Sequence, residues 1–327
     1  MTTEKAGAVR THSTSFGPGE LWALGGAVAY ALTNIFSRVA VVAADPLAAP
    51  AFRLLPTLAI AWTRVGGSRQ GGSRLRPSSA DFVGWRVMLI LFLGGAVGTS
   101  IGTVAFFYAL QAGGVVLTVP VLATNILWSA IIAALFLKER LTARMVAGIV
   151  AAVSGVALLG YGRSAGSEVL PGTLAAIPLA LVTALSWATA ANCTRYALTR
   201  GVDKYLAIAL SQTCGLVLLV GILFAVGRGA LLWTTALSAI GLFLLAGLLS
   251  AVALICDMHA LSLTTVASVL TISGTNPVIS TILAVVFLGE DLRPLMAIGT
   301  LLTVVGVLYV QLSKGETEVV GEPDVVE

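Results

Sequence analysis

The chain consists of long apolar runs separated by short polar segments. Ten runs of roughly 20 apolar residues occur, the length that a helix needs to cross a bilayer core of about 30 Å. Because backbone N–H and C=O groups cannot face lipid unpaired, each run predicts a transmembrane helix. The expected spans cover residues 21–42, 47–65, 87–110, 115–137, 145–161, 171–194, 205–226, 239–258, 266–288 and 295–312.

The second run is the least regular. Pro50, Arg53 and Pro56 interrupt it, so hydropathy alone allows a re-entrant segment in place of a full span. An internal repeat gives this run a partner and favours spanning. Only a few residues join the third run to the fourth, and the eighth to the ninth, which predicts two tight antiparallel hairpins.

Composition supports a membrane protein. Hydrophobic residues make up 57% of the 327 positions, charged residues make up 10%, and the mean hydropathy is +0.98. A soluble globule of this size would need more polar surface. The net charge of +4 is modest, and the arginines fall in short clusters between apolar runs. We therefore expect the lipid bilayer and a small-molecule substrate as partners, and no nucleic acid.

The basic residues predict the orientation, because cytoplasmic loops carry an excess of Lys and Arg. With the amino terminus inside, 14 basic residues lie on the cytoplasmic side, and three lie outside: Arg163, Arg228 and Arg293. This predicts a multi-pass protein of the cell membrane with an even number of spans and both termini cytoplasmic. Residues 1–20 are expected to form a flexible tail without the apolar stretch of a signal peptide, and residues 313–327 an acidic tail.

An internal repeat relates the two halves of the chain. Residues 109–158 align with residues 260–309 at a constant offset of 151, and 17 of the 50 positions are identical. The identities include polar pairs, which shared hydrophobicity would not align: Thr124 with Thr275, Asn125 with Asn276, Ser129 with Ser280 and Glu139 with Glu290. A weaker match at offset 157 pairs the first run with the sixth.

Five spans in each repeat are an odd number, so the second repeat must enter the membrane upside down relative to the first. The fold class that we predict is all-α integral membrane, with ten transmembrane helices in two inverted five-helix repeats. The first repeat covers residues 21–161 and the second covers residues 171–312.

A family resemblance is carried by two segments, FFYALQAGGVVLTVPVLATNILWSAIIAALFLKERLT and HALSLTTVASVLTISGTNPVISTILAVVFLGEDL. They resemble the paired motif of the EamA family, in the drug/metabolite transporter superfamily. Its elements are an aromatic-Ala-Leu turn, small residues that open the fourth and ninth spans, a Leu-x-Glu end and a Gly-rich following span. The resemblance covers nearly the whole chain. Asp257 and His259 depart from it, because an aromatic-rich end is usual there, and Pro120 has no counterpart.

The resemblance implies a secondary transporter of amino acids, metabolites or drug-like compounds that works by alternating access without a cofactor, and we expect export. One alternative is a membrane binding or sensor protein without transport, which would normally carry an appended soluble domain. The less favoured alternative is an intramembrane enzyme. An enzyme would need paired acids or a histidine cluster, and the sequence has two histidines, His12 and His259. We expect no catalytic residues and no metal.

Substrate sites in inverted-repeat carriers lie near the midplane, where helices are interrupted. Two polar stripes that each share one helix face fit this description: Thr118, Asn125 and Ser129 on the fourth span, and Ser273, Asn276 and Ser280 on the ninth. Pro277 predicts a kink beside Asn276. For the two asparagines, lining of a solute cavity and hydrogen bonding between helices both stay open. For a single Ser or Thr, bonding between helices is favoured.

Arg53 is the most informative charge, because an intramembrane cation is costly and normally faces a cavity or a partner. It could bind an anionic group of the substrate; the alternatives are snorkelling and bonds to backbone carbonyls. Tyr30 and Trp187 are paired by the repeat and could line the pathway from opposite sides, although most membrane aromatics pack or anchor at the interface.

Asp257 and His259 lie within about one turn of the expected cytoplasmic end of the eighth span. One hypothesis is proton coupling, and the competing interpretation is a solvated helix end. Glycines recur at spacings of four on the third span and at repeat-related positions on spans five and ten. They predict close packing within the monomer, with a homodimer seam on spans five and ten as the alternative.

Overall fold

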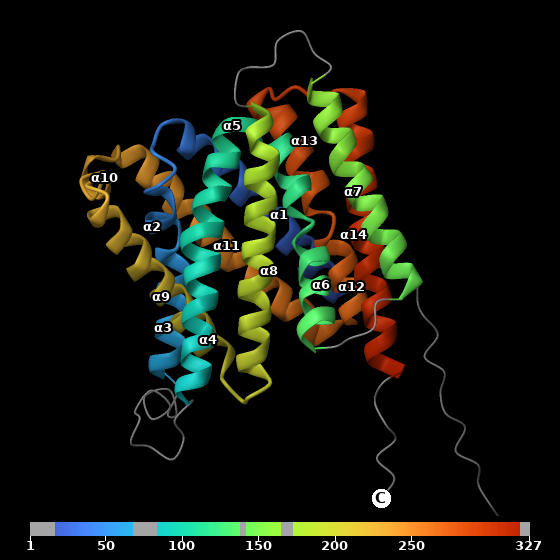
Figure 1. The fold of residues 1–327 in the computed structure, drawn as a ribbon, viewed down its shortest axis with the longest axis horizontal. Helices are drawn as coiled ribbons and strands as arrows, with labels where there is room; N and C mark the ends of the chain where they lie inside the picture. The colour runs from blue at the N-terminus through green and yellow to red at the C-terminus, as the bar shows by residue number, and fades with distance from the viewer. Residues whose placement is uncertain (1–16, 68–83, 138–141, 165–172, 321–327) are drawn as a thin grey trace, which may run out of the picture.

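The computed structural model describes residues 17–67, 84–137, 142–164 and 173–320, which form a bundle of helices without strands (Figure 1). Most of the expected N-terminal tail, residues 321–327 of the expected C-terminal tail, and Glu139 lie outside the described residues. The helices are α1 (Pro18–Val42), α2 (Ala49–Arg53), α3 (Leu55–Gly67), α4 (Trp85–Gly95), the π-helical η2 (Ala96–Gly102), α5 (Thr103–Leu122), α6 (Asn125–Leu137), α7 (Ala143–Ser164), the short η3 (Thr173–Ala175), α8 (Ala176–Leu198), α9 (Lys204–Ala225), α10 (Leu231–Thr234), α11 (Leu237–Leu263), α12 (Val266–Ser273), α13 (Asn276–Leu288) and α14 (Pro294–Val320).

Eight helical stretches among the described residues are long and apolar enough to cross a membrane, where the sequence predicted ten. Two features account for the difference. The expected second span is divided into α2 and α3, each too short to count alone. The expected third and fourth spans share one helical stretch, Trp85–Leu122, which reverses at Gly114 with a φ of 71°. The remainder of the expected fourth span is the 13-residue α6.

Proline explains part of this segmentation. Pro56 lies in the first turn of α3 and has no N–H to donate to the carbonyl of Phe52, so the helix breaks at Leu54. In the two related halves, α6 begins at Asn125 and α13 begins at Asn276. Both repeats therefore interrupt a helix at the same aligned position, although Pro277 has no equivalent in the first half. The kink predicted beside Asn276 is confirmed.

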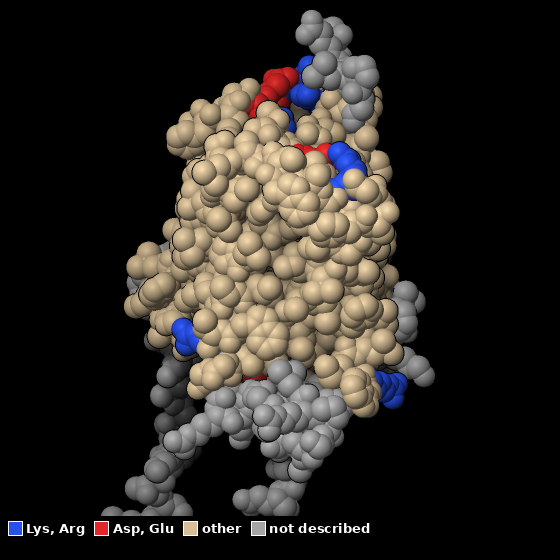
Figure 2. All heavy atoms as spheres, turned by 90° about the vertical axis from the view of Figure 1, so that its left-hand side faces the viewer, with Lys and Arg blue, Asp and Glu red and all other residues tan. Residues whose placement is uncertain are grey.

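The surface has the character of a membrane protein. Many large apolar side chains are exposed, among them Leu89, Val150, Val217 and Val286. On the face that Figure 2 presents, the charged side chains of the described residues lie toward the upper and lower ends and leave a wide uncharged band between them. A band of this kind is what lipid solvates. Together with the long apolar helices, it makes this a multi-pass membrane protein.

The ends of the helices define a lower and an upper side of the bundle. The lower side is the one on which α14 ends, and the upper side holds α10 and the junction of α13 with α14 (Figure 1). The beginning of α1 lies on the lower side next to the junction of α11 and α12, where the Thr264 hydroxyl donates to Glu20 at 2.5 Å. The last helix continues to Val320, beyond the end expected at Leu312.

Glycines allow the closest helix contacts. A Cβ added to Gly155 or Gly306 would collide with backbone atoms of the partner helix, because α7 and α14 pack backbone to backbone. The glycines of the expected third span, Gly94, Gly98 and Gly102, face α8, where an added Cβ would collide with side-chain atoms. The predicted glycine faces are thus used within the chain, as favoured from the sequence.

Candidate functional site

A cavity of about 330 Å³ lies among α1, the α2–α3 break, η2, α8, α9 and α11. Each of these helices lines it with residues from its middle or from the half nearer the lower side. The lining is mixed: small residues and hydroxyls come from η2 and α8, aromatic rings from α1 and α8, and polar groups from α2, α9 and α11. The groups that can contact a solute include Tyr30, Arg53, Thr99, Trp187, Gln212 and Ser250.

Arg53 enters the cavity where the second expected span is broken. Its Nη2 donates to the Ser250 hydroxyl at 3.3 Å, and its guanidinium carbon lies 5.3 Å from the centre of the Phe106 ring. Its Nε is enclosed and has no hydrogen-bond partner among the described residues. No acidic side chain is among the residues that line this cavity. A cation in this position is held by a hydroxyl and an aromatic face, and lacks a counter-ion within the described chain.

Gln212 adds a second unsatisfied group to the same cavity. Its Oε1 is buried and accepts no hydrogen bond from the described residues. The cavity thus offers a charged donor at Arg53 and a neutral acceptor at Gln212. Buried polar groups are costly when unpaired, because they lose their bonds to water. A solute with an anionic acceptor and a hydrogen-bond donor would satisfy both.

The two repeat-related aromatics also line the cavity, from α1 and α8. Trp187 donates from Nε1 to the Thr103 hydroxyl at 3.4 Å, and its ring centre lies 5.4 Å from that of Phe106. The structure therefore brings Tyr30, Arg53 and Trp187 together around one space. Their role in binding a solute stays a prediction.

The upper end of the cavity is filled by aromatic residues. Phe106, Phe107 and Phe243 are fully buried, and their rings pack edge to face. Beyond them, on the upper side, Asp45 accepts from Arg228 at 2.6 Å. In this conformation, packed rings separate the cavity from the charged upper end.

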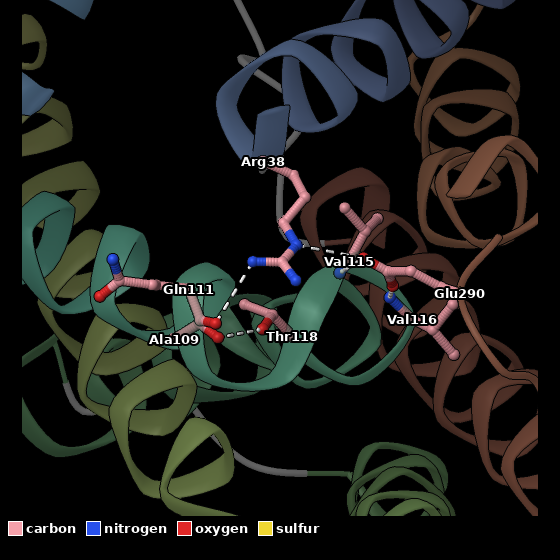
Figure 3. A network of polar contacts seen from close by, with 7 residues as sticks. All are labelled: Arg38, Ala109, Gln111, Val115, Val116, Thr118 and Glu290. Carbon is pink, nitrogen blue, oxygen red and sulfur yellow. Dashed lines mark hydrogen bonds and ion pairs between the residues drawn. The ribbon is translucent and has the colours of Figure 1, made fainter. Parts of the chain in front are cut away.

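A polar network on the upper side joins the two repeats (Figure 3). The carboxylate of Glu290 accepts from the backbone N–H groups of Val115 at 2.9 Å and Val116 at 2.8 Å. These amides begin the helical segment that follows the reversal at Gly114. Arg38 donates to Glu290 at 3.4 Å and to the Gln111 carbonyl at 3.2 Å. Glu290 thus caps a helix of the first repeat, with Arg38 as its counter-ion.

The serine and asparagine stripes lie outside the lining of the Arg53 cavity. Asn34 donates to the Ser280 hydroxyl at 3.1 Å, and Ser280 donates to Asn276 at 2.8 Å. In the other half, Asn192 donates to the Ser129 hydroxyl at 3.0 Å. The repeat-related serines are therefore each bound by an asparagine of α1 or α8. Asn125 is half-buried, and its role as a lining residue stays a prediction.

Two members of these stripes have local partners. The Thr118 hydroxyl donates to the Ala109 carbonyl at 3.0 Å, across the reversal at Gly114. The Ser273 hydroxyl donates to Asp257 at 3.0 Å. Sequence reasoning did not include Asn34 or Asn192. Asn34 could have been found, because it lies one helical turn after Tyr30 in an otherwise apolar span.

Asp257 and His259 lie on α11 near the lower side and have different surroundings. Asp257 is half-buried and faces Ser273 of α12 and Gly26 of α1. His259 is exposed, and its ring centre lies 5.1 Å from that of Trp22. Neither lines the Arg53 cavity. Among the described residues, no group of three His, Cys, Asp or Glu side chains could hold a metal ion.

Comparison with known proteins identifies the family of this chain. The model of the EamA-like transporter family matches residues 17–161 and 174–312. The chain therefore belongs to the EamA family of membrane transporters, and each match covers one of the two repeats found in the sequence. A search of curated proteins gave no match. A solved structure described as "Crystal structure of protein" is similar to this chain at 19% identity, over 92% of this chain and 98% of that one, with a TM-score of 0.55. That likeness concerns the fold alone.

Proposed function

We propose that this protein is a secondary transporter that exports small solutes carrying an anionic group, and that Arg53 binds that group. The observation that carries the proposal is a cation in a cavity without an acidic partner among the described residues. An ion removed from water is stabilised by an opposite charge, and here the solute supplies it. Family membership supports transport over a sensor or an enzyme.

The size of the cavity narrows the substrate class. A volume of about 330 Å³ is at the small end of ligand pockets, which span roughly 300–1,000 Å³. It favours amino acids and small metabolites over larger drug-like compounds. A donor group on the solute, such as an ammonium or hydroxyl, would meet Gln212, and an apolar portion would pack against Tyr30 and Trp187.

We propose further that the chain has ten spans in two inverted repeats, with both termini in the cytoplasm. The α2–α3 segment is then the second span, and the reversal at Gly114 separates the third from the fourth. The excess of basic residues in the expected cytoplasmic loops supports the orientation. The lower side is then cytoplasmic, the cavity lies in the cytoplasmic half, and solute would load from the cytoplasm. Alternating access requires the upper network to open.

The test is counterflow into proteoliposomes, with labelled small carboxylates and their neutral amides as the panel. We expect at least one carboxylate to be taken up by the wild-type protein, and Arg53→Gln to lower its uptake by about tenfold or more, because a charge-assisted bond is lost. Arg86→Gln removes an exposed cation outside the cavity and should leave uptake unchanged. Equal uptake of acids and amides, or of wild type and Arg53→Gln, would overturn the proposal.

A further inference from the structure

Three neighbouring segments, α2 with α3, α9 and α11, each present one stripe of residues along a common crevice that leads from Arg53 toward the lower side. On α2 and α3, Arg53, Thr57, Ile60 and Arg64 follow one another at spacings of four, three and four. Such spacings keep residues on one face of a helix. On α9 the stripe is Gln212, Ile208 and Tyr205, and on α11 it is Ser250, Leu254, Met258 and Ser262. Helix α3 packs against both α9 and α11 (Figure 1).

Three spaces follow one another along these stripes. The Arg53 cavity of about 330 Å³ shares Thr57, Ile208 and Leu254 with a gap of about 20 Å³. That gap shares Tyr205, Ile255 and Met258 with a pocket of about 280 Å³, here called the mouth pocket. Because consecutive spaces have walls in common, they form one line through the lower half of the bundle.

We propose that this line is a solute passage and that the mouth pocket is a second binding site for small anions. The mouth pocket is lined by Arg64, Tyr205, Ile255, Met258, His259 and Ser262. The guanidinium of Arg64 lies 5.8 Å from the centre of the Tyr205 ring, so a cation stands over an aromatic wall, as Arg53 does over Phe106. The proposal rests on the proposed function for the nature of the solute, and on the stripes and spaces for its route.

The charges along the passage favour an anion. A cation stands at each end, and none of the described residues that line the three spaces is acidic. Arg64 and Arg53 are 11 positions apart, about 16 Å along a helix at 1.5 Å per residue. The two cations therefore provide two successive binding positions for an anion.

The gap between the Arg53 cavity and the mouth pocket is an apolar constriction. Its walls include Ile60, Ala251 and Leu254, and its volume is near the minimum of about 10–15 Å³ that holds one water. A charged solute cannot pass without displacement of these side chains. Ile60 and Leu254 are half-buried, and α3 begins only at Leu55, after the helix break. Rotation of their side chains would open the way to Arg53, so they act as the gate of the passage.

The first experiment tests the mouth pocket without knowledge of the substrate. Met258→Cys is introduced after Cys193, Cys214 and Cys256 are replaced by Ala, in vesicles that expose the side carrying the C-terminus. Anionic and cationic methanethiosulfonates are compared by reaction rate. We expect Arg64→Gln to lower the anionic-to-cationic rate ratio about three- to tenfold, and Arg200→Gln, an exposed cation of the same side, to leave it unchanged. An unchanged ratio in Arg64→Gln, or an equal fall in Arg200→Gln, would overturn the site.

The second experiment tests the gate. Thr57 lines both the Arg53 cavity and the gap. Labelling of Thr57→Cys by the anionic reagent therefore reports passage of the reagent along this route. We expect Ile60→Trp to slow this labelling by tenfold or more, while Ala59→Trp, on the exposed side of α3, leaves it unchanged. Gel filtration and thermal melting confirm that both variants fold. Labelling in Ile60→Trp at the wild-type rate would rule out this route. If the wild-type protein shows no counterflow of carboxylates but both labelling experiments give the expected results, the proposed function is contradicted and the passage is not.

Discussion

Arg53 is the residue on which the functional argument depends, and its position could be predicted. A charge inside an apolar run is costly, so the sequence alone places it at a cavity or a partner. Tyr30 and Trp187 could be singled out because the repeat pairs them. The partners of Ser129 and Ser280 could not be predicted, because periodicity gives the face of a helix and not the neighbour that it meets. In the structure, Asn192 is the partner of Ser129 and Asn34 is the partner of Ser280.

Gln212 offers a test that inserts the missing counter-ion. Gln212→Glu places a carboxylate in the cavity of Arg53, where it competes with an anionic solute. We expect the concentration of carboxylate that gives half-maximal counterflow to rise by about tenfold or more. Gln212→Met, of similar size and without charge, should change it much less. A rise of equal size in both variants would mean that lost packing, and not charge, is responsible.

Asp257 is the candidate for proton coupling. It is a half-buried carboxylate near the lower side, held by the Ser273 hydroxyl. If it carries the coupled proton, Asp257→Asn should abolish the stimulation of uptake by a pH gradient and preserve exchange at uniform pH. The measurement is uptake into proteoliposomes with and without an imposed gradient. Gradient-driven uptake at the wild-type level in Asp257→Asn would assign Asp257 to helix packing.

At the scale of elements, apolar run length predicted where helices lie better than how they are divided. The expected fourth and ninth spans began at residues 115 and 266, whereas the structure begins a helix at Asn125 and Asn276, which the repeat pairs; Pro56 and Pro277 mark two of the breaks. The reversal at Gly114 was expected as a tight hairpin. The cap that fixes it could not be predicted, because Glu290 lies 175 positions from Val115. A contact between segments this far apart has no local signature in the sequence.

The cap by Glu290 makes a prediction about stability. Glu290→Gln removes the ion pair with Arg38 and the charge on two hydrogen bonds to the amides of Val115 and Val116. Hydrogen bonds to charged groups contribute about 1.5–3 kcal/mol, so we expect a clear fall in the midpoint of thermal unfolding in detergent. Asp291→Asn is the control, because Asp291 is exposed and pairs with nearby Arg293. Equal midpoints for the two variants would mean that the cap contributes little.

At the scale of the molecule, the two repeats explain why one cavity lies between helices of both halves. Helices α1, α2 and η2 of the first half and α8, α9 and α11 of the second line it. On the upper side, packed aromatic rings and the Arg38–Glu290 network close the way to the cavity in this conformation. The sequence predicted the two halves and an interface between them. It could not predict which side is closed, because both conformations of a carrier share one sequence.

The central claim is that this cavity opens to each side in turn. Ala191→Cys, an exposed cavity residue on α8, can report access in a protein whose native cysteines are replaced. A membrane-impermeant thiol reagent is applied to vesicles of either orientation, with and without a transported carboxylate. We predict labelling from both sides, with the carboxylate shifting the two rates in opposite directions. Labelling from one side alone under every condition would contradict the account.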